Sequence, residues 1–349
     1  MRKLAFAYTQ YHLLNLINLC QTKLVNDEVD LIAFNPEESG VVQLLDRVNR
    51  KNIFNRIIVV NNFFVRGNGI KKVRNIIIKM FTVIKNRRVI NRFISGYEYD
   101  EFYTYGFNME STIAYGMISR MTSVKYIYYE EGIGSYIRGI SFGYRFYHKW
   151  FLGLLLTKIP KSPDRLLLYS PSMLTYSVPD TVVVDRLPRI CNVELINYLW
   201  DYEPRPGRLR RFILMEQPNN DNNEQVELFH LFKKYDAAVK MHPRSPFKGL
   251  YSDMEIIDDW NGTWEIICLN DNVQDSVIVS LCSTACFTPK LLFDFEPVVI
   301  FLENILEEKS VDEEIFRGIV NKLKECYRDK NKVIIPDSVE DLGFILEKL

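Results

Sequence analysis

The sequence lacks several features that would place it in a class at once. None of its six cysteines belongs to a Cys-x-x-Cys pair, so neither a zinc site nor a disulfide framework is indicated and reduced thiols are expected. No apolar run approaches the roughly 20 residues that cross a bilayer, and the short apolar run near the N-terminus does not predict a signal peptide. These absences predict a cytoplasmic protein that meets a membrane, if at all, at its inner face.

Negative charge is missing from one long segment. The formal net charge of the chain is zero, yet no Asp or Glu occurs between Arg47 and Tyr97. Basic and apolar residues alternate within this segment, which predicts a basic amphipathic helix over residues 70–94. Its basic face is either solvated, with the helix packed on its own sheet, or it meets anionic lipid or a lipid-linked acceptor. No DNA- or RNA-binding motif accompanies it, so a nucleic-acid partner is not expected.

Strand-like and helix-like segments alternate along the chain, which at 349 residues is long enough for two domains. This alternation predicts parallel sheets with helices on both faces, because parallel strands need crossover connections. We expect residues 1–190 to form an N-terminal Rossmann-like domain and residues 191–349 a C-terminal one. A proline-studded stretch between about 165 and 208 would connect them. The expected fold is α/β, with two parallel sheets facing each other across a cleft.

The expected strands cover residues 3–8, 29–34, 56–60, 101–105 and 124–129 in the first half, and 211–215, 237–241, 254–257, 276–280 and 298–302 in the second. The expected helices cover residues 11–23, 70–94, 110–121, 144–156, 223–234, 264–269, 285–294, 311–327 and 339–349. We allow the last of these helices to pack back on the first domain.

Two adjacent carboxylates follow the expected strand 124–129. Glu130 and Glu131 precede Gly132, and Ser135 follows closely. Ligands of open α/β sheets bind outside the carboxyl ends of the strands, so this pair lies where a ligand is expected. We expect one carboxylate to point inward as a general base and the other to hold the loop by hydrogen bonds. A surface loop with two solvated acids is the alternative.

Three motifs of the second half also follow expected strands. His242 precedes Pro243, and a histidine in this place can donate to a phosphate or protonate a leaving group. Ser283 and Thr284 can cap a helix or offer hydroxyls to a phosphate. The loop after the strand 211–215 carries Glu216 and Asp221, either of which can face the cleft. A structural turn or a helix cap is the alternative for each motif.

Taken in order, these motifs resemble those of the bacterial sialyltransferases of glycosyltransferase family 52, the lipooligosaccharide and capsule enzymes. That family shows an acidic pair followed by glycine, then a His-Pro motif, then a Ser/Thr pair. The matching residues here are Glu130-Glu131-Gly132, His242-Pro243 and Ser283-Thr284. The opening residues 8–15 and the Gln217-Pro218 loop are similar to the corresponding segments of the family.

The resemblance implies a GT-B fold and an inverting transfer of N-acetylneuraminic acid from CMP-N-acetylneuraminic acid (CMP-Neu5Ac). The acceptor would be a galactose-type hydroxyl of a capsule or lipooligosaccharide, on a glycan or a lipid-linked oligosaccharide. Enzymes of this family can form homodimers. The resemblance assigns donor binding to Gln217, His242, Pro243, Ser283, Thr284 and Gly132, and the acceptor side to Thr9, Gln10, His12 and Ser135.

The resemblance leaves the base open between the acidic pair and Asp221, which precedes the His-Pro motif. Neither a cofactor nor a metal is expected, since CMP carries a single phosphate and no Asp-x-Asp triplet occurs in the chain. Three other functions stay open: a CMP-Kdo transferase, a polyol-phosphate transferase, and a non-catalytic scaffold at the membrane.

Overall fold

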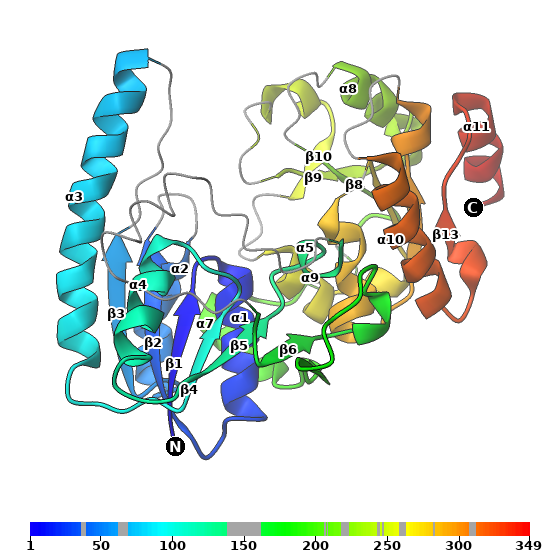
Figure 1. Cartoon of the computed structure of the whole chain (residues 1–349). Coiled ribbons are helices and arrows are strands. Elements are labelled where there is room, and N and C mark those ends of the chain that lie inside the picture. Colours follow the sequence, from blue (N-terminus) through cyan, green and yellow to red (C-terminus); the bar gives the residue numbers. More distant parts are fainter. Residues whose placement is uncertain are drawn as a thin grey trace. The chain divides into compact units, whose positions relative to one another are not determined.

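The computed structural model describes residues 1–35, 40–61, 69–137, 162–205, 207, 209–217, 223–242, 245, 248–257, 263–281, 283–306 and 312–349. The chain divides into two compact units, each with its own parallel sheet (Figure 1). Unit 1 comprises Met1–Glu131, Arg138–Pro171 and Ser177–Asn192, and unit 2 comprises Gly132–Ile137, Ser172–Tyr176 and Val193–Leu349. The chain therefore passes from unit 1 to unit 2 within the acidic motif, between Glu131 and Gly132.

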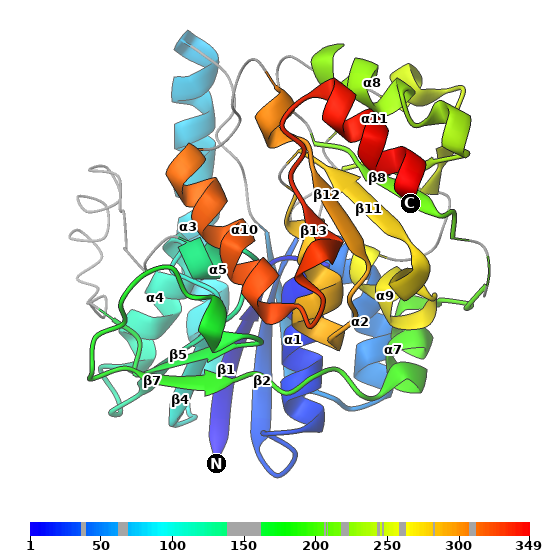
Figure 2. The ribbon, with the colours of Figure 1, turned by 90° about the vertical axis from the view of Figure 1, so that its right-hand side faces the viewer.

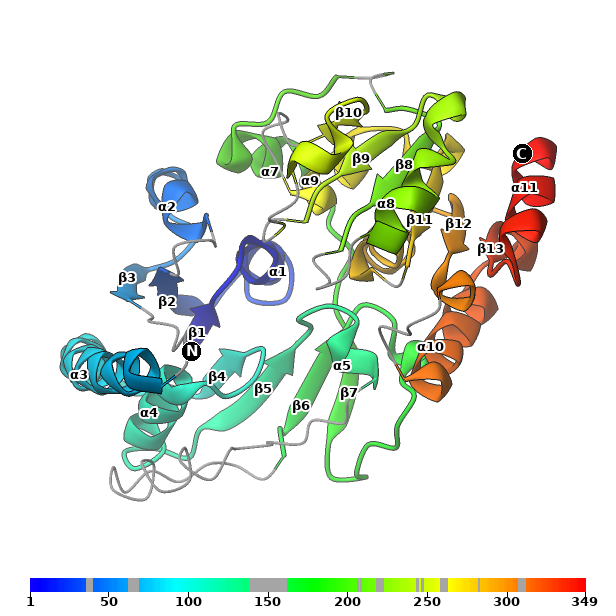
Figure 3. The ribbon, with the colours of Figure 1, turned by 90° about the horizontal axis from the view of Figure 1, so that it is seen from above.

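The described residues of unit 1 form a seven-stranded sheet in the order β3-β2-β1-β4-β5-β6-β7, with parallel pairing throughout. Helices α1 and α2 lie on one face of this sheet, and α3 and α4 on the other (Figure 3). The strands are β1 (Arg2–Ala7), β2 (Glu28–Asn35), β3 (Arg56–Asn61), β4 (Glu101–Thr104), β5 (Lys125–Tyr129), β6 (Arg165–Leu168) and β7 (Val183–Arg186), and the helices are α1 (Gln10–Gln21), α2 (Val41–Arg50), α3 (Gly69–Ile94) and α4 (Met109–Ile118).

The described residues of unit 2 form a six-stranded parallel sheet in the order β10-β9-β8-β11-β12-β13. Its strands are β8 (Phe212–Met215), β9 (Ala238–Lys240), β10 (Glu255–Ile256), β11 (Val277–Ser280), β12 (Val298–Phe301) and β13 (Val333–Ile334), and its α-helices are α5 (Gly134–Ile137), α7 (Val193–Trp200), α8 (Asn223–His230), α9 (Trp264–Asn270), α10 (Glu313–Cys326) and α11 (Val339–Lys348). Short 3₁₀ turns are η1 (Pro171–Met173, at the unit boundary), η2 (Lys233–Tyr235), η3 (Lys248–Tyr251), η5 (Val273–Asp275), η6 (Thr284–Cys286), η8 (Glu303–Ile305) and η9 (Lys330–Lys332), and η7 (Pro289–Phe293) is a π turn.

The two sheets share one topology. In each, the first strand lies in the middle, the second and third extend to one side, and the fourth and later strands extend to the other. The strand order therefore reverses between β1 and β4 in unit 1 and between β8 and β11 in unit 2. Ligands of open α/β sheets bind at such a switch point, outside the carboxyl ends of the strands.

The strands are apolar runs because both faces of each sheet are covered. In unit 2, Leu214, Val279 and Ile300 are fully buried on adjacent strands. Leu342 and Leu346 lie in the same core, and Figure 2 shows their helix, α11, beside the strands of this sheet. Helix starts follow side-chain capping: Asn108, Asp312 and Ser338 accept N–H groups from the first turns of α4, α10 and α11.

The predicted α/β architecture with parallel sheets is confirmed, but several elements differ from prediction. The stretch 165–208 was expected to be an irregular connection, yet it contains β6, β7 and α7, because Pro171, Pro179 and Pro188 fall between these elements. Helix α2 and strand β13 were also not predicted. The helix expected over 285–294 is broken into η6 and η7 ahead of and at Pro289. The helix expected over 144–156 lies outside the described residues.

Among the residues that the structure describes, no helix is both long enough and apolar enough to span a bilayer.

Candidate functional site

The carboxyl ends of three neighbouring strands in unit 2 carry the motifs of the second half. Strand β8 lies between β9 and β11, so the residues after Met215, Lys240 and Ser280 come together at one edge of the sheet. Gln217, His242 and Ser283 each follow one of these strands. The switch point of unit 2 is therefore the candidate site.

Glu216 contacts the loop that begins at His242, here called the histidine loop, at this edge of the sheet. It is 2 % exposed; its Oε2 accepts the His242 N–H at 2.9 Å, and its Oε1 accepts the Ser245 hydroxyl at 2.9 Å. A hydrogen bond from the Glu216 N–H to the Lys240 carbonyl, 3.1 Å, joins the same two loops through the backbone. Glu216 is therefore a positioning residue for His242, a role that leaves it turned away from solvent.

A second set of hydrogen bonds shapes the serine–threonine loop. The buried Ser280 hydroxyl donates to the Met215 carbonyl at 3.2 Å and accepts the Ser283 N–H at 3.1 Å. The Ser283 hydroxyl in turn accepts the Ala285 N–H at 3.3 Å and caps η6. Thr284 is exposed at this edge.

Gly132 of the acidic motif lies against Thr284, within unit 2. A Cβ atom at position 132 would be 3.3 Å from Thr284 Cγ2, and the backbone φ of Gly132 is +116°. L side chains rarely adopt that conformation, so the positive φ favours glycine here, and the close approach of Thr284 adds a tight contact for any larger residue. Of the predicted donor-binding residues, the structure thus brings Gly132 and Thr284 together.

Gln217 is held by a glutamine of α8. Its N–H donates to Gln225 Oε1 at 3.0 Å, and Gln225 Nε2 donates back to its carbonyl at 3.3 Å. Gln225 is buried and also donates to the Tyr251 hydroxyl at 3.3 Å. Burial raises the pKa of Tyr251 to about 12, so its phenol stays protonated at neutral pH. The backbone of Gln217, directly after β8, is therefore fixed by its two hydrogen bonds with Gln225.

A carboxyl group of α9 lies close enough to Lys240 for their charges to interact. Burial raises the pKa of Glu265, and the Thr263 hydroxyl and the Lys240 charge oppose that rise. The preceding Trp264 donates its indole N–H to the Ala285 carbonyl at 2.9 Å and ties α9 to the serine–threonine loop. The amino end of α9 thus contacts two of the segments that form the candidate site.

In unit 1, Glu130 is an internal anchor. It is fully buried; its Oε1 accepts the Tyr11 hydroxyl at 2.8 Å, and its Oε2 accepts the Tyr169 N–H at 2.9 Å. Its own carbonyl accepts the Asn15 side chain at 2.9 Å, and Asn15 accepts the Tyr169 hydroxyl at 2.8 Å. Glu130 therefore holds the loop by joining α1, β5 and β6, and Glu131 is the exposed member of the pair.

The residues predicted on the acceptor side of unit 1 follow β1, at its switch point. Thr9 caps α1: its hydroxyl accepts the His12 N–H, and His12 Nδ1 accepts the Thr9 N–H, both at 3.3 Å. Thr9 and Gln10 are half-buried, whereas His12 is buried and stacks on Tyr105, with ring centroids 3.8 Å apart. Thr9 and Gln10 are thus the accessible members of this group.

Burial lowers the pKa of His12 from 6.5 to about 3. Between these values the unfolded chain binds a proton that the folded chain does not, so stability falls as the pH falls. From pH 7.5 to pH 5.5, this one group is expected to remove roughly 1.4 kcal/mol of unfolding free energy. Urea unfolding at both pH values checks this, with His12→Phe as the variant that keeps an aromatic ring but cannot titrate. An identical pH dependence in the two proteins contradicts the assignment.

Of the remaining predicted site residues, one is a buried serine and two lie outside the residues that the structure describes. Ser135 of α5 is buried in unit 2, and its carbonyl accepts the Tyr176 hydroxyl at 3.0 Å. Asp221 and Pro243 lie outside the described residues, as does Pro218. In the part of the chain that the structure describes, no group of three or more His, Cys, Asp or Glu side chains could hold a metal ion.

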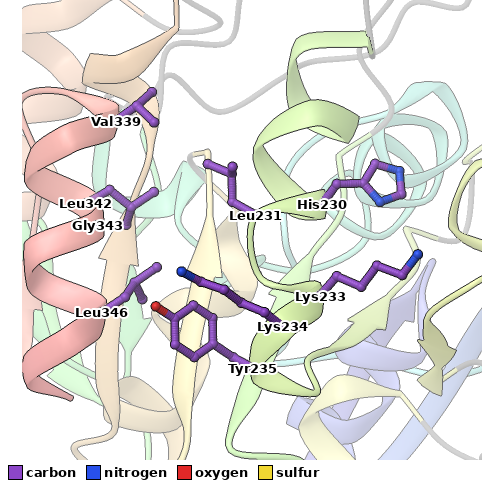
Figure 4. Close-up of a pocket in the computed structure, with 9 residues that line it drawn as sticks. All are labelled: His230, Leu231, Lys233, Lys234, Tyr235, Val339, Leu342, Gly343 and Leu346. Atoms are coloured by element: carbon purple, nitrogen blue, oxygen red, sulfur yellow. The ribbon is translucent and has the colours of Figure 1, made fainter.

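A pocket of about 650 Å³ lies elsewhere in unit 2, between η2 and α11 (Figure 4). The segment lining one side leads into the amino end of β9, whereas the candidate site lies at the carboxyl ends. Lys233 is paired with Asp253, and the Lys234 ammonium lies 4.9 Å from the Tyr235 ring centroid. Apart from these groups the walls are largely apolar, so we do not assign the chemistry to this pocket. Its lining residues are His230, Leu231, Lys233, Lys234, Tyr235, Val339, Leu342, Gly343 and Leu346.

The sequence did not reveal the residues whose role is to position other residues by hydrogen bonds. Ser280, Gln225 and Asn15 were not singled out, and Glu216 was considered only as a residue facing the cleft. Each is buried and bonded to a residue far away in the chain, and no spacing in the sequence reports such a contact. The one usable signal was a polar residue directly at the end of an apolar strand, as with Ser280 and Glu216.

No protein-family model and no curated protein sequence matches the chain. Among solved structures, the chain is similar to S. aureus MnaA in a co-structure with UDP: the TM-score is 0.50 at 14 % identity, over 95 % of this chain and 89 % of that one. It is also similar to Arabidopsis thaliana UGT89C1 complexed with UDP, with a TM-score of 0.54 at 10 % identity, over 99 % of this chain and 89 % of that one. At these identities the likeness concerns the fold alone. It agrees with the two Rossmann-like sheets described above, and the chain has a GT-B fold.

Proposed function

We propose that the chain is a glycosyltransferase that uses a nucleotide-sugar donor, and that it is an inverting sialyltransferase with CMP-Neu5Ac as donor. The observation that carries this proposal is the set of groups at the switch point of unit 2. There His242, Gln217 and the Ser283-Thr284 pair follow three adjacent strands, in the place where α/β sheets bind their ligands. Both structural neighbours are complexes with UDP, which supports a nucleotide ligand.

The chemistry of the proposed reaction fits the residue types at this edge. The acceptor hydroxyl oxygen forms a bond to the anomeric carbon of the sialic acid while the bond from that carbon to the phosphate oxygen breaks. CMP leaves with the electron pair, so negative charge grows on its phosphate. His242, Thr284 and the cation of Lys240 are suited to stabilise that charge or to give it a proton.

The acceptor proton needs a base. Glu130 is engaged by Tyr11 and Tyr169, which leaves Asp221 and the exposed Glu131 as the carboxylates to consider. We assign the base to Asp221, in line with the family resemblance, and the acceptor side to the loop after β1. Glu131 would then orient the acceptor.

A donor panel tests the proposal directly. Purified protein is incubated with CMP-Neu5Ac, CMP-Kdo, CDP-glycerol and UDP-N-acetylglucosamine, each with a galactose-terminated oligosaccharide, and nucleotide release and glycan mass are followed. CMP release with a product heavier by one sialic acid is expected for the first donor alone. Turnover of CMP-Kdo or CDP-glycerol instead would transfer the assignment to that class, and binding of no nucleotide would favour a non-catalytic scaffold.

Linkage analysis of the product then identifies the acceptor position. An inverting enzyme gives the α-linked product from the β-linked donor, so the anomeric configuration in an NMR spectrum of the product is a second readout. Retention of the donor configuration would contradict the single displacement described above.

A further inference from the structure

Helix α3 has a buried face that is fully accounted for within unit 1. Val83, Ile90 and Ile94 are at most 1 % exposed and lie along one side of the helix, toward the sheet. Asn86 lies on the same side, and its side chain donates to the Asn61 carbonyl at 2.6 Å. This face explains how the helix packs, but it uses only half of the circumference.

The opposite face carries an exposed stripe of apolar and then basic residues. Its members follow spacings of three and four residues, so they lie in one line along the helix. Phe81 is 70 % exposed and Ile78 37 % exposed, and Ile84, 43 % exposed, lies beside them. The stripe consists of Ile78, Phe81, Lys85, Arg88 and Arg92, all of them exposed.

No described acid neutralises this stripe. Among the described residues, none forms an ion pair with Lys85, Arg88 or Arg92, and the chain has no Asp or Glu between Arg47 and Tyr97. Glu110 of α4, the helix packed beside α3, is 1 % exposed and lies 3.4 Å from the Asn86 amide on the buried side. The exposed face is therefore purely cationic and apolar.

We propose that this face of α3 docks on a bilayer that contains anionic lipid. Exposed Phe and Ile side chains can insert at the level of the headgroups, while a line of Lys and Arg meets the phosphates above them. A nucleic acid would use the cations but gain nothing from Ile78 and Phe81.

The direction of α3 sets the apolar end of the stripe, Ile78 and Phe81, closer to the acceptor side of unit 1 than its basic end, Lys85 to Arg92. The helix follows β3 and runs back along the sheet, so its amino end lies on the side of the carboxyl ends of the strands (Figure 1). Thr9, Gln10 and Glu131 follow β1 and β5 on that same side of unit 1. Resting on the proposed function, the inference is that the acceptor is a lipid-linked glycan held at the membrane surface.

Vesicle sedimentation tests the docking without any need for catalysis. The full chain is mixed with vesicles of phosphatidylcholine alone and of phosphatidylcholine with 30 % phosphatidylglycerol. Binding is expected only to the second, and it should weaken as salt is raised. Lys85→Glu with Arg88→Glu is expected to lower the partition coefficient roughly tenfold or more, and Phe81→Ser severalfold.

Matched control variants place the same changes elsewhere on the described surface. Lys23→Glu with Lys125→Glu reverses two exposed charges of unit 1, and Phe344→Ser removes a side chain of α11 that is 64 % exposed. Both controls are expected to bind vesicles like the unchanged protein. Equal binding to neutral and anionic vesicles, or equal loss in the α3 and control variants, overturns the proposal, as does tighter binding to a duplex oligonucleotide than to the vesicles.

A comparison of two acceptors separates this inference from the proposed function. The α3 variants are expected to keep their activity on a water-soluble galactosyl acceptor and to lose it on the same glycan presented on a lipid in anionic vesicles. Equal activity of these variants on both acceptors overturns the inference and leaves the proposed function intact. If the protein binds anionic vesicles but turns over no nucleotide sugar, the proposed function fails and the membrane-docking surface stands.

Discussion

Replacing His242 by alanine is expected to lower the rate of sialyl transfer about 10²- to 10³-fold, because the donor phosphate loses its proton donor. Glu216→Ala is expected to lower the rate nearly as much as His242→Ala does. The Glu216 carboxylate accepts the His242 N–H at 2.9 Å, so without it His242 loses the side-chain contact that fixes its backbone. The measurement is initial CMP release at saturating acceptor, with kcat and KM for the donor separated.

A double-mutant cycle distinguishes positioning from an independent role. If Glu216 acts through His242, the double variant should be about as slow as His242→Ala alone. Once the imidazole is absent, positioning the backbone of residue 242 no longer affects the rate. If the two losses multiply, Glu216 acts independently of the histidine. Rates are compared per folded molecule, and urea unfolding measures any loss of stability separately.

Two conservative variants serve as controls for this cycle. Ser245→Ala removes the other partner of Glu216 and leaves the bond to His242, so a change of about threefold or less is expected. In Glu216→Gln the amide oxygen can still accept the His242 N–H while the amide nitrogen faces the Ser245 hydroxyl. Its rate should therefore lie well above that of Glu216→Ala.

The strand ends could be predicted from the sequence because each is an apolar run closed by polar or small residues. The switch points could not, since they depend on the order of strands within a sheet and not on their order in the chain. The neighbourhood of Glu216, His242 and Ser280 exists only because β8 lies between β9 and β11. Strands β6 and β7 were missed for a different reason: each has only four residues, and the prolines around them suggested an irregular connection.

The acidic pair shows where a prediction from sequence stops. Adjacent residues at a strand end point in opposite directions, so one carboxylate was expected to hold the loop. Which one it would be depends on Tyr11 and Tyr169, more than thirty residues away in the chain on either side. His12 is similar: the family resemblance placed it on the acceptor side, but it is buried and stacks on the ring of Tyr105.

Glu130→Gln is expected to lower stability while sparing the chemistry. The Gln amide nitrogen would face one of two hydrogen-bond donors, the Tyr11 hydroxyl or the Tyr169 N–H, and a buried donor left without an acceptor costs about 1–3 kcal/mol. Urea unfolding should show this loss, whereas the transfer rate per folded molecule should stay within a few fold of the unchanged protein. Tyr11→Phe, which removes one of the two bonds, should show a smaller loss of the same kind.

Asp221→Asn is expected to lower the transfer rate by about 10²- to 10⁴-fold, because the acceptor hydroxyl loses its base. Donor affinity should change little, since the base acts on the acceptor. Glu131→Gln is the decisive third variant, because Glu131 is the exposed carboxylate of the pair, whereas Glu130 is buried and engaged by Tyr11 and Tyr169. A large loss of rate in Glu131→Gln together with a near-normal Asp221→Asn would move the base from the loop after β8 to the loop after β5, and with it the assignment of the proton to unit 1.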